Sequence, residues 1–156
     1  GIDDLEKVLA EAGFDFSQID LTAAAGIHSG KGLLTVNSTD HYTAPGEQGL
    51  SAQLIVYPIL DGRVVRIACA DAFFVWDGHR QASPERLMAI AEAQSTRRLV
   101  KAEYKPSHGS ITVSVNQPLG FDGAFRSSQF ARCVGEIVGF LDDIAVRMGE
   151  VDARLQ

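Results

Sequence analysis

The apolar residues near the C-terminus recur with a spacing that is typical of one long helix. They follow one another in alternating steps of four and three residues: Phe130, Val134, Ile137, Leu141, Ile144, Met148, Val151 and Leu155. Residues at these steps share one face of an α-helix, so the pattern predicts a helix over about 125–154. A helix with such a stripe must bury it against a second layer, which constrains the rest of the chain.

The apolar stripe is broad in its first part and narrow in its last. Four further apolar residues widen the first part: Cys133, Val138, Phe140 and Ala145. This breadth predicts that 130–144 packs on a sheet as core. The last three apolar residues are expected to project past the sheet edge as a contact seam for a second subunit or a partner segment: Met148, Val151 and Leu155. As alternatives, the last turn of this helix packs on the chain's own first helix, or it is frayed.

Strand patterns fill much of the remaining sequence. The runs 53–59 and 64–69 flank an Asp61-Gly62 pair, which predicts a tight hairpin because glycine accepts positive φ. The runs 99–104 and 111–115 are also strand-like, and the second alternates apolar and polar residues. A further short strand is expected at 33–36.

Two more helices are expected from capping signals. Asp3 and Glu6 have the capping-box spacing at the start of an amphipathic segment over 3–12. Ser83 precedes Pro84, which is the usual order of an N-cap and a first helical residue. The resulting order is α-β-ββ-α-ββ-α. It predicts an α+β fold with an antiparallel sheet of about five strands and three helices. With no linker visible, residues 1–156 are expected to form a single domain.

Charge and hydropathy narrow the classes of partner. Fourteen Lys and Arg against twenty Asp and Glu give a net charge of −6, which disfavours nucleic acid. The longest apolar run, 54–60, is far too short to span a bilayer, and no signal peptide is recognisable. Cys69 and Cys133 lack a metal or redox spacing and are interpreted as buried free thiols, which suits the cytoplasm, with a single disulfide as the alternative.

No pattern for a cofactor or catalytic site is convincing. The segment 26–32 resembles a phosphate-binding loop, but it has the wrong spacing around Lys31 and leads into a strand. The four histidines lie in loop-like segments without the spacing of a zinc site: His28, His41, His79 and His108. We therefore expect no metal, no cofactor and no enzymatic activity.

Two other groups of residues have structural explanations. The adjacent acids Asp142 and Asp143 are expected on the solvated side of the last helix, because consecutive helical residues lie about 100° apart. Phe73, Phe74 and Trp76 form the main aromatic cluster, which we interpret as core rather than as a ligand patch.

The order of elements over 83–148 resembles a known family. A Ser-Pro helix is followed by the strand LVKAEYKP, the strand SITVSVNQPLG and the closing helix FARCVGEIVGFLDDIAVRM. This order is similar to that of the YbjN family of bacterial proteins, which are labelled sensory transduction regulators. Their fold resembles that of class I type III secretion chaperones, small acidic proteins that bind an extended partner segment, often as dimers. Residues 14–50 do not align with this family pattern.

The resemblance implies a non-enzymatic, regulatory or chaperone-like module that binds a protein segment or a second copy of itself. From the net charge and the short apolar runs we expect neither nucleic acid nor a membrane as a partner. One alternative is a secretion chaperone proper. Another is a small enzyme whose site is assembled from His41, His79 and loop acids. Fold analogy alone does not decide among these functions.

Overall fold

The computed structural model describes residues 7, 11, 16–19, 33–42, 50–122 and 124–155. Within these ranges the chain forms six strands and two helices, in the order β1 (Phe16–Ile19), β2 (Leu33–Tyr42), β3 (Leu50–Ile59), β4 (Val64–Phe74), α2 (Pro84–Ser95), β5 (Val100–Lys105), β6 (Ser110–Pro118) and α3 (Ser127–Leu155). Lys7 and Glu11 are also helical.

The six described strands form one antiparallel sheet in the order β1-β2-β3-β4-β6-β5. Strand β6 lies between β4 and β5 although it comes last in the sequence. This exchange arises because α2 carries the chain from the end of β4 to the far side of β6. Among the described strands, β5 is therefore an edge of the sheet.

The predicted hairpin between β3 and β4 is confirmed. The loop contains three successive residues with positive φ, which are Leu60, Asp61 and Gly62 at 51°, 55° and 78°. The Gly62 N–H donates to the Ile59 carbonyl at 3.1 Å, and Val64 then pairs with Ile59. The turn chemistry recognised in the sequence thus sets the register of the two central strands.

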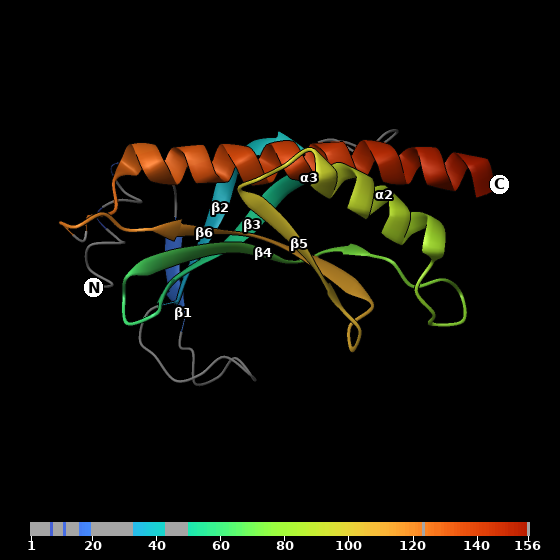
Figure 1. Cartoon of the computed structure of the whole chain (residues 1–156), viewed down its shortest axis with the longest axis horizontal. Coiled ribbons are helices and arrows are strands. Elements are labelled where there is room, and N and C mark those ends of the chain that lie inside the picture. The colour runs from blue at the N-terminus through green and yellow to red at the C-terminus, as the bar shows by residue number, and fades with distance from the viewer. Residues whose placement is uncertain are drawn as a thin grey trace.

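Both helices lie over one face of the sheet, with α3 extending across it and α2 running beside the C-terminal half of α3 (Figure 1). The core lies between these layers. Its fully buried large side chains are Leu54, Ile67, Ile111, Phe130, Ile137, Phe140, Leu141 and Ile144. The part of α3 expected to be core, 130–144, is therefore confirmed as core.

The α+β class is confirmed, whereas the strand count differs from the sequence-based expectation. The described residues contain six strands instead of about five, because β1 pairs with β2 at a position where no strand was expected. Strand β2 also extends to Tyr42, beyond the expected 33–36, and β4 continues through 72–74. Most of the first expected helix, 3–12, lies outside the described residues.

The end of α3 differs from the expected contact seam. Met148 is 8% exposed and Val151 is 1% exposed, so both are buried within the chain. Helix α2 covers them, since it packs along this part of α3. The prediction that these two residues form a free seam was wrong. Leu155 is 59% exposed, and its role as a contact residue stays a prediction.

Candidate functional site

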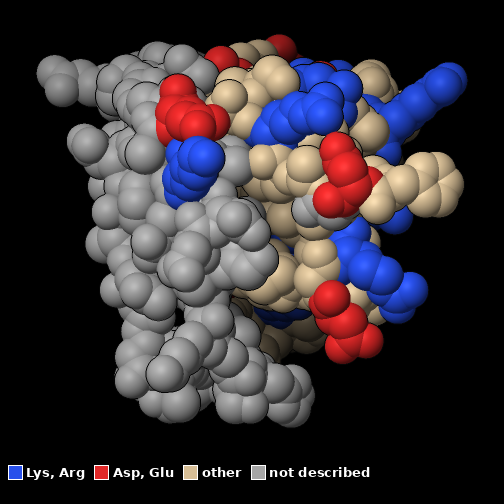
Figure 2. Space-filling view, turned by 90° about the vertical axis from the view of Figure 1, so that its left-hand side faces the viewer, with Lys and Arg blue, Asp and Glu red and all other residues tan. Residues whose placement is uncertain are grey.

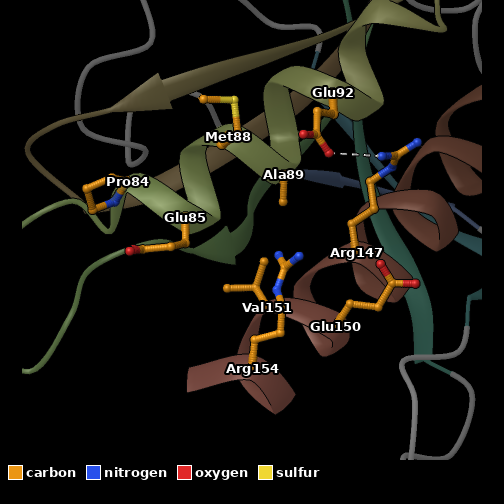
Figure 3. Close-up of a pocket in the computed structure, with 9 residues that line it drawn as sticks. All are labelled: Pro84, Glu85, Met88, Ala89, Glu92, Arg147, Glu150, Val151 and Arg154. Atoms are coloured by element: carbon orange, nitrogen blue, oxygen red, sulfur yellow. Dashed lines mark hydrogen bonds and ion pairs between the residues drawn. The ribbon is translucent and has the colours of Figure 1, made fainter. Parts of the chain in front are cut away.

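A groove lies between α2 and the last turns of α3 (Figure 3). The start of α2 is fixed by Ser83, whose hydroxyl accepts a hydrogen bond from the Arg86 N–H at 3.3 Å. The groove has a volume of about 410 Å³. The residues that line it are Pro84, Glu85, Met88, Ala89, Glu92, Arg147, Glu150, Val151 and Arg154.

The floor of the groove is apolar. Ala89 and Val151 face each other between the helices and are both buried. Met88 extends the apolar surface on the α2 side, and 61% of it is exposed. In Figure 3 the Arg154 side chain lies beside Val151 and points toward α2. A groove with a small-residue floor and an exposed methionine can accept varied apolar side chains, because the methionine thioether is flexible.

The rim of the groove is charged and partly paired. The Arg147 guanidinium joins Glu92 of α2 at 3.3 Å to Asp143 of α3 at 3.2 Å. By contrast, Glu85 and Arg154 form no ion pair with another described residue. Surface ion pairs contribute little to stability, so these rim charges add little to the packing of the two helices.

A second contact joins the two helices close to the groove. The Arg86 guanidinium binds the Asp152 carboxylate at 2.9 Å and also donates to the Phe74 carbonyl at 3.1 Å. It therefore ties the end of β4, the start of α2 and the end of α3 together. Phe74 itself is 62% exposed, so the expectation that this aromatic ring is core was wrong.

The α2 side of the groove was not expected from the sequence. Its residues recur as Glu85, Met88, Ala89 and Glu92, which is one face of the helix. The sequence does contain a signal for it, which is Met88 between Glu85 and Glu92 on the predicted helix. It could have been noticed, but only the tertiary fold shows that the end of α3 lies beside that face.

A polar cluster stands apart from the groove, at a bulge in β4. Asp71 has a φ of 50° and lies where the register between β4 and β6 shifts. Its carboxylate accepts from the Ser110 hydroxyl at 2.5 Å and lies 3.1 Å from Nδ1 of His108. The Ser110 hydrogen bond, followed by the smaller effects of His108 and Lys105, lowers the pKa of Asp71.

The hydrogen bonds around Asp71 stabilise the bulge in β4, and they do not have the arrangement of an activated serine nucleophile. The Ser110 hydroxyl donates to the carboxylate of Asp71, whereas an activated serine would donate to the imidazole. Ser110 is also fully buried. The Asp71 N–H is held by the Thr112 hydroxyl at 3.4 Å, so two side chains of β6 fix the bulged residue.

The histidines named in the sequence analysis do not come together among the described residues. The backbone N–H of His79 donates to Asp77 in an exposed turn, and His108 lies at the bulge of β4. His28 and Lys31 lie outside the described residues, as does the side chain of His41. In the part of the chain that the structure describes, no group of three or more His, Cys, Asp or Glu could hold a metal ion.

Both cysteines are buried free thiols, as predicted. Burial, with a smaller contribution from the charge of Asp71, raises the pKa of Cys69 to about 11. Burial also raises the pKa of Cys133, whose thiol lies 3.6 Å from the Gln117 side-chain oxygen. Neither thiol has the lowered pKa that nucleophilic cysteines need.

Basic and acidic side chains are mixed on the described surface at one end of the molecule (Figure 2). Figure 2 shows Lys and Arg interspersed with Asp and Glu over the described part of one end of the molecule. Neither α2 nor α3 combines the length and the apolar character that a bilayer crossing requires, and the same holds for every described helix.

The comparisons with known proteins bear on the fold. No family model and no curated protein matches the chain. Its structure is similar to the crystal structure of YbjN from E. coli, described as a candidate transcription regulator. The TM-score is 0.51 at 14% sequence identity, and the match covers 99% of this chain and 93% of that chain. The chain therefore has a YbjN-like fold, as the resemblance over 83–148 implied. At this identity the likeness concerns the fold and not the activity.

Proposed function

We propose that the protein is a non-enzymatic regulatory module that binds a segment of a protein partner in the groove between α2 and α3. The observation that carries the proposal is the composition of the groove. A buried apolar floor, the exposed Met88 and charges of both signs that form no ion pair with another described residue lie together on two helices. An amphipathic helix could place its apolar face against the exposed Met88, over the closed floor, and its charges against the rim.

The distribution of charges favours a mixed-charge partner. Arg147 is already engaged by two carboxylates, whereas Arg154 has no ion pair with a described residue. Arg154 is thus available to a carboxylate of the partner, and Glu85 and Glu150 to a basic residue. Complementary charges at a rim speed association and exclude wrong partners more than they add affinity.

The rival functions have less support. The small enzyme requires His41 and His79 to converge with loop acids, and His79 lies in an exposed turn where its backbone N–H binds Asp77. The description of the similar structure as a regulator favours a regulatory role over catalysis. A secretion chaperone proper would also bind a protein segment, so the identity of the partner separates these two functions. We extend the proposal to a cytoplasmic location, which the two free thiols support.

Site-specific photocrosslinking in the source cell tests the proposal. A benzophenone amino acid replaces Met88 at the groove. The matched control places the same group at Val146, which is 45% exposed on α3 but does not line the groove. We expect residue 88 to capture one protein reproducibly, through a segment that mass spectrometry maps to an amphipathic helix, while residue 146 captures none.

A second arm tests whether the groove itself mediates the capture. In the protein with the crosslinker at residue 88, Arg154→Glu reverses a groove charge and should strongly reduce crosslinking. Equal crosslinking from residues 88 and 146 would contradict the proposal. Capture that is insensitive to Arg154→Glu would contradict it as well, because the partner would then bind elsewhere.

A further inference from the structure

The outer edge of β5 is occupied by a side chain of α2. The Gln94 amide donates to the Val100 carbonyl at 2.7 Å, and its oxygen accepts from the Ala102 N–H at 2.7 Å. Backbone groups of Val100 and Ala102 therefore point away from β6, toward the open side of the sheet. Gln94 thus satisfies one outward carbonyl and one outward N–H of β5, groups that a neighbouring strand would otherwise bind.

An unprotected edge strand readily pairs with another chain, and natural proteins usually block it with charges, bulges or a covering element. Here the block is one flexible amide. It is held near the end of α2, where the Gln94 side chain also lies 3.5 Å from the Arg97 carbonyl. The edge is therefore closed by two hydrogen bonds rather than by a covering strand.

The sequence of β5 is complementary to itself about Ala102. If two copies pair antiparallel with their Ala102 residues opposite each other, Lys101 of each copy faces Glu103 of the other. In the same register Val100 faces Tyr104, a pairing of β-branched and aromatic side chains that stabilises sheets. Lys101 is exposed and Glu103 is 44% exposed, so both side chains are accessible at the edge. Within its own chain the Glu103 carboxylate also pairs with Lys105 at 3.0 Å and with Arg66 at 3.4 Å.

We propose that the β5 edge is a self-association surface for a second copy of this chain, and that the Gln94 amide keeps it closed. The inference is independent of the partner groove, since it rests on the hydrogen bonds of Gln94 and on the sequence of β5. The occupant is a second β5 strand in the register centred on Ala102, which joins the two sheets into one.

The test compares the wild-type chain with Gln94→Leu, which cannot make either hydrogen bond. Equal amounts of unlabelled and ¹⁵N-labelled protein are mixed and treated with a zero-length carbodiimide crosslinker. The amide between Lys101 of one copy and Glu103 of the other is then identified by its mixed isotope pattern. Loss of two intramolecular hydrogen bonds should raise this product, and the dimer fraction in sedimentation, by about tenfold or more.

Charge variants test the register. In the Gln94→Leu background, Glu103→Lys places like charges opposite each other and should return dimerisation to the wild-type level. Adding Lys101→Glu to that protein restores opposite charges and should restore the dimer. Gln94→Asn provides a second way to open the edge, because its amide is one methylene too short to reach β5, and it should behave as Gln94→Leu does.

Two results would overturn the proposal. One is the absence of any mixed-isotope product from folded Gln94→Leu and Gln94→Asn proteins, which would mean that α2 itself obstructs the edge. The other is a dimer that forms equally well with Glu103→Lys, which would place the association in another register or on another surface. Thermal melting of each variant establishes that the protein tested is folded.

Discussion

Adding a single methyl group at Gly109 should strongly lower the free energy of unfolding. Gly109 has a φ of 64°, and its N–H donates to the Lys105 carbonyl at 2.9 Å at the turn into β6. A Cβ built on Gly109 would lie 2.0 Å from Cδ2 of Trp76 and 2.2 Å from Cε2. The Trp76 ring therefore lies against the glycine, and the Trp76 backbone forms a β-bridge with Ala82.

Two costs combine in Gly109→Ala. A left-handed conformation costs a non-glycine residue about 1–2 kcal/mol. Forcing a methyl group into a packed site typically costs a further ~1–3 kcal/mol. The expected loss in the free energy of unfolding is therefore about 2–5 kcal/mol, or a fall in Tm of roughly 4–20 °C for a chain of this size.

Two other glycines separate these costs. Gly62 has a φ of 78° with nothing within 4 Å of an added Cβ, so Gly62→Ala should show the backbone cost alone. Gly78 has open space and no positive φ, so Gly78→Ala should be close to neutral. Urea unfolding followed by fluorescence of Trp76, the single tryptophan, measures all three. If Gly109→Ala is no more destabilising than Gly62→Ala, the close contact with Trp76 does not constrain the turn.

Three further outcomes are expected. Val151→Ala should lower the free energy of unfolding by about 1–3 kcal/mol, because Val151 is buried. Leu155 is exposed, so Leu155→Ala should change the free energy of unfolding by no more than about 0.5 kcal/mol in the same urea denaturation assay. Burial raises the pKa of Cys69 to about 11, so this thiol should react with a thiol reagent near neutral pH only when urea unfolds the chain. Fast reaction of Cys69 in the folded protein would contradict its burial. The lowered pKa of Asp71 contributes stability that is present above its ordinary value of 3.8 and is lost as the pH falls through the folded-state pKa. Asp71→Asn should therefore be less stable than wild type near neutral pH and lose less stability on acidification, as measured by urea unfolding at several pH values.

Local signals in the sequence predicted much of the central fold. The Asp61-Gly62 turn, the Ser83 cap and the apolar spacing of 130–144 each act through contacts with near neighbours in the sequence. Such contacts can be read without knowing the topology. Strand β1 carried no comparable signal, and the expected strand at 33–36 continues to Tyr42.

The parts of the structure that the sequence did not predict depend on distant pairs. Asp71 is bound to Ser110, 39 residues away, and that contact cannot be inferred before β4 and β6 are known to be neighbours. The same reason explains the error at Met148 and Val151. Their spacing on α3 was read correctly, but the element that covers them was unknown, and α2 buries them against the chain itself.

The partner groove can be tested most directly by calorimetric titration. The ligand is a synthetic peptide of the segment captured at residue 88, titrated into wild-type protein, Met88→Glu and Val146→Glu. The two variants are matched, because each adds a carboxylate to an exposed helical position that already has acids one turn away on both sides. A groove that binds the peptide predicts about tenfold or greater loss of affinity for Met88→Glu and unchanged affinity for Val146→Glu. Equal affinity for all three proteins would contradict the assignment of this groove as the binding site.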